Sequence, residues 1–126
     1  MNVVDSSAWL EYFANGLNAP FFAEAIEDTG RLVVPTLVLY EVFKRVLQQT
    51  GESKALHVIA TMQQGTVVDL NSTLALSAAK ISIEHRMPMA DSVIFATARS
   101  YDATLWTQDE DFKGLDGVRY QKKQTG

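Results

Sequence analysis

Short apolar runs rich in β-branched residues alternate along this chain with longer segments in which apolar residues recur at helical spacing. The short runs predict strands at residues 1–5, 31–34, 66–70 and 103–106, with an edge strand at 118–120. The longer segments predict helices at residues 6–14, 20–28, 36–49, 53–64, 72–86 and 90–101, and a short helix at 108–113. This alternation predicts an α/β fold with a mainly parallel central sheet and helices on both faces.

The length of 126 residues is that of one domain, and we expect a single domain spanning residues 1–126. The sequence has no cysteine, which excludes disulfides, thiolate metal sites and a cysteine nucleophile. No apolar stretch reaches the roughly 18 residues that a membrane helix needs, and the first residues lack the basic start of a secretory signal. We therefore expect a cytoplasmic protein without a membrane partner.

The charge is uneven along the chain. The sequence carries 15 acidic and 11 basic residues, a net charge of −4. Residues 113–126 hold four basic residues and one acid, so the part before them is strongly acidic. A broad surface for nucleic-acid phosphates normally shows an excess of Lys and Arg. Composition alone therefore argues mildly against a nucleic-acid-binding protein.

Four carboxylates stand where a purely structural sequence has little use for them. Asp5 ends the first predicted strand in VVDSSAW, and Asp109 follows the last interior strand in LWTQDEDF. Glu41 is the only charge in LVLYEVF, and Asp91 has no charged neighbour between residues 88 and 98. Because the carboxyl ends of parallel strands share one edge of the sheet, we expect Asp5, Asp91 and Asp109 to gather there. Glu41 can lean over the same edge from its helix.

Each of these acids also has an ordinary structural interpretation. Asp5 and Asp91 can be N-caps of the helices that they precede, where the helix dipole favours a carboxylate. Glu41 has Lys44 and Arg45 at the spacing of a helix ion pair, which is worth about 0.3–0.5 kcal/mol.

The segment TQDEDF has a structural interpretation of its own. Thr107 and Glu110 match a capping box, which accounts for Glu110. Asp109 and Asp111 are left without a structural role beyond favouring the start of a short helix.

The four acids together are harder to explain structurally than any one of them. Two carboxylates about 4 Å apart repel by about 4 kcal/mol at an effective dielectric of 20. A group of three or four needs a cation or large pKa shifts. Oxygen ligands without cysteine or paired histidine suit Mg²⁺ or Mn²⁺ rather than zinc. Such an ion activates water and neutralises phosphate charge during in-line displacement, so the residues favour a Mg²⁺-dependent phosphoryl-transfer site.

The motifs VVDSSAWLEYF, PTLVLYEV, MADSVIFATA and LWTQDEDF, in this order and spacing, resemble those of PIN-domain ribonucleases. The resemblance is to the VapC-type toxins of prokaryotic toxin–antitoxin pairs, and it spans essentially the whole chain. It implies a PIN-like fold and a Mg²⁺- or Mn²⁺-dependent endoribonuclease that leaves 5′-phosphate and 3′-hydroxyl ends. It also implies a homodimer neutralised by a cognate VapB-type antitoxin, which binds DNA and reaches into the acidic site.

The family's conserved acids fall on Asp5, Glu41, Asp91 and Asp109 of this sequence. The resemblance implies that these residues are catalytic and hold the metal, with Asp109 completing its surroundings or holding a second ion. Supporting positions fall on three further residues, Ser6, Thr107 and Asp111. Ser6 and Thr107 are expected to orient water or a carboxylate by hydrogen bonds.

The residues that grip RNA are open at this point. The basic candidates are Lys44, Arg45, Arg86, Arg99 and the C-terminal residues. A stripe of apolar residues on one helix exceeds what one core-facing side needs, so it is either a dimer or antitoxin surface or simply buried. The stripe consists of Val38, Leu39, Val42, Phe43 and Val46.

Two other classes of protein share some of these features. A receiver-like phospho-acceptor signalling domain has a similar length and acids at strand ends, with Asp69 as its acceptor here, but Asp5 has no acidic neighbour. A catalytically silent PIN binding module would keep the fold without the chemistry. A related nuclease of single-stranded DNA differs only in its substrate.

Overall fold

A five-stranded sheet forms the centre of the computed structural model, which describes residues 1–125. The strands lie in the order β3-β2-β1-β4-β5, and all four neighbouring pairs are parallel. Their bounds are β1 (Asn2–Val4), β2 (Leu32–Pro35), β3 (Thr66–Val68), β4 (Thr104–Thr107) and β5 (Val118–Tyr120). The expected α/β class and parallel sheet are therefore confirmed.

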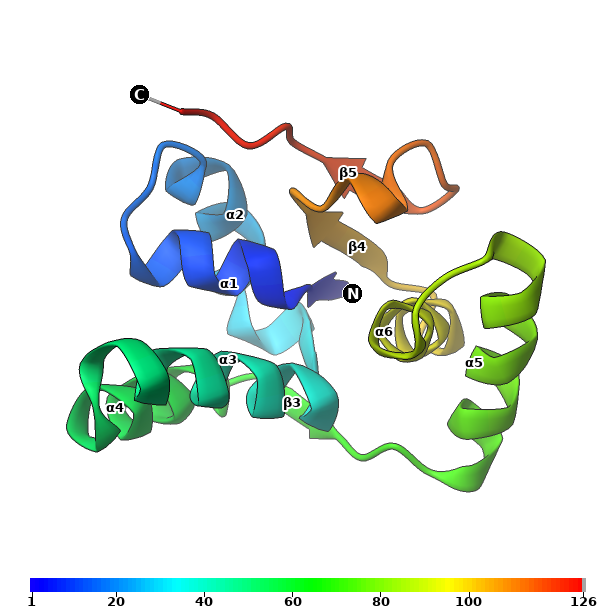
Figure 1. Ribbon diagram of the computed structural model, residues 1–126, viewed down its shortest axis with the longest axis horizontal. Helices are drawn as coiled ribbons and strands as arrows, with labels where there is room; N and C mark the ends of the chain where they lie inside the picture. The colour runs from blue at the N-terminus through cyan, green and yellow to red at the C-terminus, as the bar shows by residue number, and fades with distance from the viewer. Residues whose placement is uncertain (126) are drawn as a thin grey trace.

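Six α-helices connect the strands and cover both faces of the sheet (Figure 1). They are α1 (Ser6–Phe13), α2 (Ala19–Ile26), α3 (Thr36–Thr50), α4 (Glu52–Met62), α5 (Ser72–His85) and α6 (Met89–Ser100). In Figure 1, α1 to α4 lie on one side and α5 with α6 on the other. Right-handed crossovers explain this arrangement, because the chain moves outward from β1 to β3 and then returns to β4 on the other side of β1.

Two short 3-10 helices complete the chain, η1 (Thr29–Arg31) and η2 (Glu110–Phe112). The helix expected at residues 108–113 is only this last single turn. The remaining expected elements are all present, with bounds that differ by a few residues at most. None of the described helices is long and apolar enough to cross a membrane.

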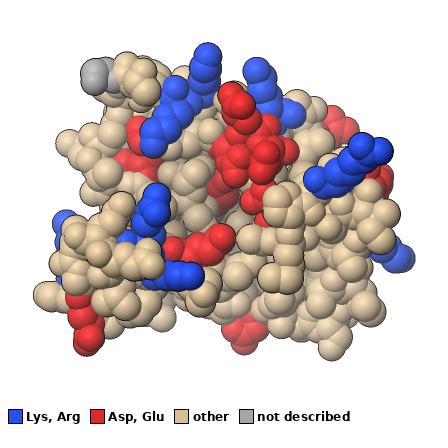
Figure 2. Space-filling view, viewed as in Figure 1, with Lys and Arg blue, Asp and Glu red and all other residues tan. Residues whose placement is uncertain are grey.

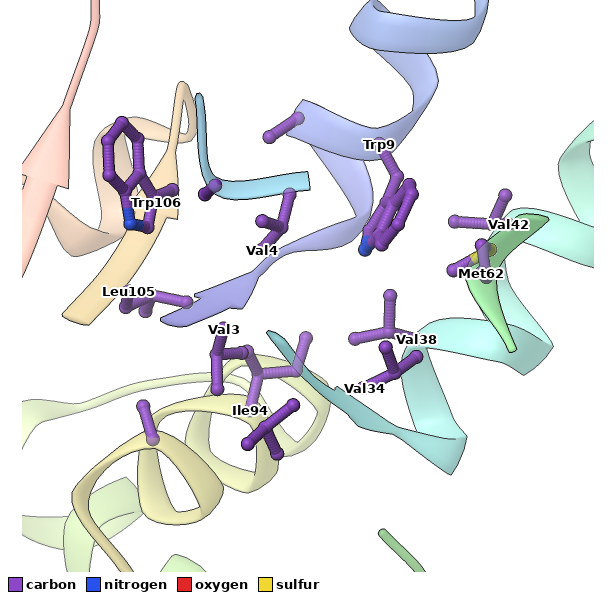
Figure 3. Close-up of a cluster of buried hydrophobic side chains, with 14 of the residues drawn as sticks. Val3, Val4, Trp9, Val34, Val38, Val42, Met62, Ile94, Leu105 and Trp106 are labelled. Carbon is purple, nitrogen blue, oxygen red and sulfur yellow. The ribbon is translucent and has the colours of Figure 1, made fainter. Parts of the chain in front are cut away.

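The core lies on both faces of the sheet, because successive side chains of a strand point to opposite sides. Figure 3 shows Val3 toward Ile94 of α6, whereas Val4 lies on the side of Trp9 of α1. Val3, Val4 and Trp9 are fully buried, and each buried side chain of this size contributes roughly 1.5–3 kcal/mol. These contacts fix α1 and α6 against β1, the strand that ends at Asp5.

The apolar stripe of α3 is explained mainly by this core. Val38, Val42 and Val46 are buried, and Leu39 and Phe43 are partly buried and pack against the same cluster. The excess of apolar residues on this helix arises because α3 packs against α1 and α4 as well as β2 and α6. The surface interpretation of the stripe is therefore wrong for its valines.

The strand order excludes the receiver-like alternative. Receiver domains of the flavodoxin-like class order their strands 2-1-3-4-5, whereas β1 here lies between β2 and β4. The direction of chain travel reverses between β1 and β4. In parallel α/β sheets the crevice at the carboxyl ends of such strands is where ligands bind.

Candidate active site

The carboxylate of Asp5 lies at the carboxyl end of β1, at this crevice. Its Oδ1 accepts hydrogen bonds from the Ser7 hydroxyl at 2.8 Å and the Ala8 backbone N–H at 3.0 Å, so Asp5 is also the N-cap of α1. Its Oδ2 accepts from the Thr107 hydroxyl at 2.6 Å. A carboxylate has about four acceptor positions, so three partners leave room for about one more.

The buried position of Asp5 changes its protonation. The side chain is only 3% exposed, and this burial raises the pKa of Asp5 to about 6. The hydrogen bonds from Thr107, Ala8 and Ser7 lower the pKa and offset part of the rise, while the charge of Asp109 adds to it. A positive charge at the crevice would reverse the shift, because it favours the ionised form.

Thr107, the last residue of β4, connects two of the acids. Its hydroxyl donates to Asp5 and accepts the Asp109 backbone N–H at 2.9 Å. The Asp109 carboxylate in turn accepts the Asp111 backbone N–H at 2.9 Å and caps η2. The capping box expected for Thr107 and Glu110 is therefore wrong, because Asp109 takes the capping role and Thr107 faces Asp5.

Asp91 reaches the same crevice from the first turn of α6. The N-cap of this helix is Pro88, so the N-cap interpretation of Asp91 is wrong. Burial raises the pKa of Asp91 to about 7, helped by a hydrogen bond with the Asp111 carboxyl and by the charges of Asp109, Asp111 and Asp5. The charges of Asp5, Asp109 and Asp111, which come from two other segments of the chain, therefore all act on the carboxyl of Asp91.

The closest group of ligand atoms comes from Asp91, Asp109 and Asp111. One carboxylate oxygen of each lies within 4.8 Å of the others. Asp111, expected only as a supporting residue, thus stands within the group because η2 turns its side chain back toward Asp91. Figure 2 shows a concentrated group of acidic atoms in the middle of this face of the molecule.

Glu41 lies outside this group of three. It sits on α3, and its Oε1 accepts a hydrogen bond from the Ser6 hydroxyl at 2.5 Å. Glu41 does not form the expected ion pair with Lys44 or Arg45. Within residues 1–125 the ion pair that is present joins His85 to Glu84. Glu41 and Ser6 instead line a hollow of about 470 Å³ with Arg45.

Three polar residues that hold the site together were not singled out from the sequence. Ser7 donates to Asp5, a contact for which the motif DSS could have been a signal. Gln108 lies between Thr107 and Asp109, and its amide oxygen accepts from the Asn18 side chain at 3.0 Å. Both side chains are buried, so they fix the segment that carries Asp109.

The donor set of the crevice suits a hard divalent cation. The pKa values of Asp5 and Asp91 are both raised. Carboxylate oxygens of Asp91, Asp109 and Asp111 lie close together, and none of them forms an ion pair with a described basic residue. Mg²⁺ and Mn²⁺ prefer carboxylate oxygens, and their charge would offset the mutual repulsion of these acids. The residues present therefore fit such an ion.

Comparison with solved structures finds proteins of similar fold. Among solved structures, a toxin–antitoxin complex from Klebsiella pneumoniae matches with a TM-score of 0.81 at 18% identity, over 98% of this chain and 99% of that chain. VapC20 of Mycobacterium tuberculosis, described as a toxin that cleaves the sarcin–ricin loop, has a TM-score of 0.75 at 19% identity, over 94% and 99%. DNA-bound VapBC from Salmonella typhimurium has a TM-score of 0.74 at 16% identity, over 97% and 98%.

Sequence comparison identifies a family for most of the chain. No curated protein sequence matches it significantly. The family pattern of the PIN domain, however, matches residues 3–118, which contain β2 to β4, most of β1, the first residue of β5 and all the acids described above. This protein belongs to the PIN domain family.

Proposed function

We propose that this protein is a Mg²⁺-dependent endoribonuclease, the toxin of a type II toxin–antitoxin pair. The observation that carries the proposal is the convergence of Asp5, Asp91, Asp109 and Asp111 at the switch point of a PIN-domain sheet. Similarity in fold to VapC proteins, one of them described as cleaving RNA, supports the substrate class. The whole of residues 1–126 acts as one domain in this proposal, and its cytoplasmic location stays a prediction.

Asp91, Asp109 and Asp111 would hold the metal, together with the remaining acceptor position of Asp5. Glu41, bound by the Ser6 hydroxyl, would contribute a further carboxylate to the metal, directly or through water. Mg²⁺, or Mn²⁺ in its place, activates water and neutralises charge on the phosphate during in-line displacement. The products carry 5′-phosphate and 3′-hydroxyl ends.

The other residues of the site position these acids. Thr107 holds Asp5 and the Asp109 backbone in one arrangement, and Ser6 fixes the rotamer of Glu41. Because Asp5 also caps α1, its carboxylate cannot swing away from the crevice without losing two hydrogen bonds. Such fixed ligands lower the reorganisation that binding and reaction require.

The partner in this proposal is a cognate VapB-type antitoxin. Three structures of similar fold are described as toxin–antitoxin or VapBC complexes, two of them with DNA. The homodimer expected from the sequence resemblance stays a prediction, which sedimentation of the purified chain will test.

Cleavage of RNA is the direct test. The wild-type protein is incubated with single-stranded RNA and with DNA of the same sequence, with Mg²⁺ or with EDTA. Asp91→Asn is compared with Asp28→Asn, a matched change at an exposed acid that precedes η1 at the opposite end of the strands. We expect the wild type and Asp28→Asn to cleave RNA with Mg²⁺ and not with EDTA. Asp91→Asn should cleave the same RNA at least about 100-fold more slowly.

Three outcomes would count against the proposal. RNA left intact by the wild type with Mg²⁺ and Mn²⁺ would make the chain a silent PIN binding module. Faster cleavage of DNA than of RNA would make it a DNA nuclease. Equal rates for Asp91→Asn and the wild type would show that the acidic crevice is not where the reaction occurs.

A further inference from the structure

Three cationic side chains surround one hollow beside the acidic crevice. Arg45 of α3, Lys54 of α4 and Lys123 of the C-terminal segment line a cavity of about 410 Å³, together with residues of α1. All three are exposed to solvent. Segments far apart in the sequence thus bring positive charge together in a protein whose net charge is −4.

These cations are uncommitted within residues 1–125. No carboxylate oxygen of the described residues lies within 4.0 Å of their charged nitrogens. Several other cations of the chain lie over aromatic rings instead, namely Lys44 over Tyr40, Lys113 over Tyr120, Arg99 over Phe95 and Arg119 over Trp106. The hollow therefore keeps positive charge available for a ligand.

The one carboxylate that lines the hollow is turned inward. Glu11 is 8% exposed, and its two oxygens accept from the Asn18 backbone N–H at 2.9 Å and from the Gln108 side chain at 3.4 Å. A carboxylate satisfied in this way by neutral donors does not need the three cations as partners.

The C-terminal segment is fixed on both sides of Lys123. The Asn18 side-chain amide donates to the Lys122 carbonyl at 3.0 Å, and the Gln124 amide donates to the Asn18 oxygen at 2.7 Å. Asn18 is itself only 2% exposed. Lys123 is thus held at the hollow by its neighbours, with its own charged end free.

The hollow continues toward the candidate active site. It shares Leu10 and Arg45 with the second hollow, which contains Glu41 and its partner Ser6. Figure 2 shows Lys and Arg atoms above and below the left half of this face, next to the central acidic group. An extended chain that passes the acids can therefore lie against Arg45 and then against Lys54 and Lys123.

We propose that this cationic hollow binds the backbone phosphates of the RNA strand next to the cleaved bond, an inference that rests on the proposed function. Single-stranded nucleic acid is held by positive side chains that follow its backbone, with aromatic rings available for its bases. Phe13 also lines the hollow, although its ring is partly buried and stacks on Trp9. RNA is favoured over an acidic polypeptide because the same strand must present its phosphate to the adjoining acids.

Binding measured without cleavage tests this inference. Fluorescence anisotropy follows a labelled single-stranded oligoribonucleotide in EDTA, between about 50 and 200 mM KCl. The variant Arg45→Gln/Lys54→Gln/Lys123→Gln is compared with Arg31→Gln/Lys80→Glu, which lowers the net charge by the same three units at exposed positions elsewhere. Thermal unfolding of both variants checks that they are folded.

The two variants should differ in their affinity for RNA although their net charges are the same. We expect the hollow variant to bind at least about tenfold more weakly at low salt, with its salt slope reduced by about 2, since each lost contact with a single strand contributes about 0.7. The control variant should keep the wild-type slope to within about 0.5.

Equal losses in the two variants would overturn the inference, because the attraction would then depend only on net charge. So would unchanged RNA binding by the hollow variant together with lost binding of a labelled poly-glutamate peptide, which would assign the hollow to a polypeptide. These readouts use no metal and no cleavage. The binding test can therefore contradict this inference while the cleavage assay supports the proposed function. A negative cleavage assay likewise leaves the result of the binding test unchanged.

Discussion

The hydroxyl of Thr107 joins Asp5 to the segment that carries Asp109, since it donates to the Asp5 carboxylate at 2.6 Å and accepts the Asp109 N–H at 2.9 Å. Two acids that are more than a hundred residues apart in sequence are thereby fixed relative to one another. Thr107 is fully buried, so no water replaces it easily. This contact gives the first prediction.

Replacing Thr107 by valine keeps the shape of the side chain and removes its hydroxyl. In the wild type the hydrogen bond from Thr107 lowers the pKa of Asp5. Its loss should therefore raise this pKa above its value of about 6 in the metal-free protein. The unsatisfied carboxylate should also lower the free energy of unfolding by about 1–3 kcal/mol. Carbon NMR titration of the Asp5 carboxyl and thermal unfolding measure the two effects, and Thr107→Ser, which keeps the hydroxyl, is the control. An unchanged pKa in the valine variant would contradict the role given to this contact.

Stability of the metal-free protein should fall as the pH rises. The pKa values of Asp5 and Asp91 are raised to about 6 and about 7 from the ordinary 3.8, so the folded state binds more protons than the unfolded state between these values. The stabilisation is therefore complete below about pH 4 and is lost as the pH passes 6 to 7. Other titrating groups add their own dependence, so the informative quantity is the difference between variants.

Asp91→Asn isolates this effect. Without an ionisable group at this position, the variant should lose less stability than the wild type between pH 5 and pH 8 in EDTA. Asp28→Asn, at an exposed acid, should follow the wild type. Chemical unfolding at the two pH values measures the difference, and parallel losses in Asp91→Asn and the wild type would contradict the assignment of the raised pKa.

A comparison of variants at Glu41 and Glu110 distinguishes a role in the site from a general effect of negative charge. Glu41 is half-buried and bound by the hydroxyl of Ser6, the residue after Asp5, whereas Glu110 is exposed on η2 and lies outside the close group of carboxylates. We expect Glu41→Gln to reduce the rate of RNA cleavage at least about tenfold and Glu110→Gln to leave it within about twofold. Initial rates at saturating Mg²⁺ measure both, and equal rates would remove Glu41 from the site.

Two glycines offer a matched test of packing around β2. A Cβ at Gly65 would lie 2.9 Å from the Leu32 carbonyl oxygen, whereas nothing lies within 4 Å of a Cβ at Gly30. Gly65→Ala should therefore destabilise the fold by about 1–3 kcal/mol. Gly30→Ala should be neutral or stabilise it by up to about 1 kcal/mol, because alanine restricts the unfolded chain. Thermal unfolding of both variants decides, and equal stabilities would show that the close approach at Gly65 is not as described.

The sequence was sufficient to predict the sheet and the position of Asp5 and Asp109. Apolar β-branched runs separated by helical segments determine a parallel sheet, and the acids directly follow the runs that become β1 and β4. The edge at which they meet then follows from the direction of parallel strands. No side-chain detail was needed for this step.

The finer arrangement of the acids could not be predicted in the same way. Asp111 joins Asp91 and Asp109 only because the Asp109 side chain accepts the Asp111 N–H and tightens the chain into a single 3-10 turn. Glu41 stands apart from these three acids, and its carboxylate is bound by the Ser6 hydroxyl instead. Such choices depend on local hydrogen bonds that compete within a fraction of a kcal/mol, and a hydrophobic pattern does not encode them.

Burial also decided between interpretations that the sequence left open. The valines of α3 are buried because four other elements pack around that helix, which its own periodicity does not reveal. The grouping of Arg45, Lys54 and Lys123 depends in the same way on how α3, α4 and the C-terminal segment meet.

The central claim is that the acids of the crevice belong together because a divalent cation joins them. Titration calorimetry with Mn²⁺ at neutral pH measures this directly, for the wild type, Asp91→Asn and the control Asp28→Asn. The account predicts saturable binding to the wild type and Asp28→Asn, with affinity lowered at least about tenfold in Asp91→Asn. Absence of binding to the wild type, or equal affinity in Asp91→Asn, would contradict it.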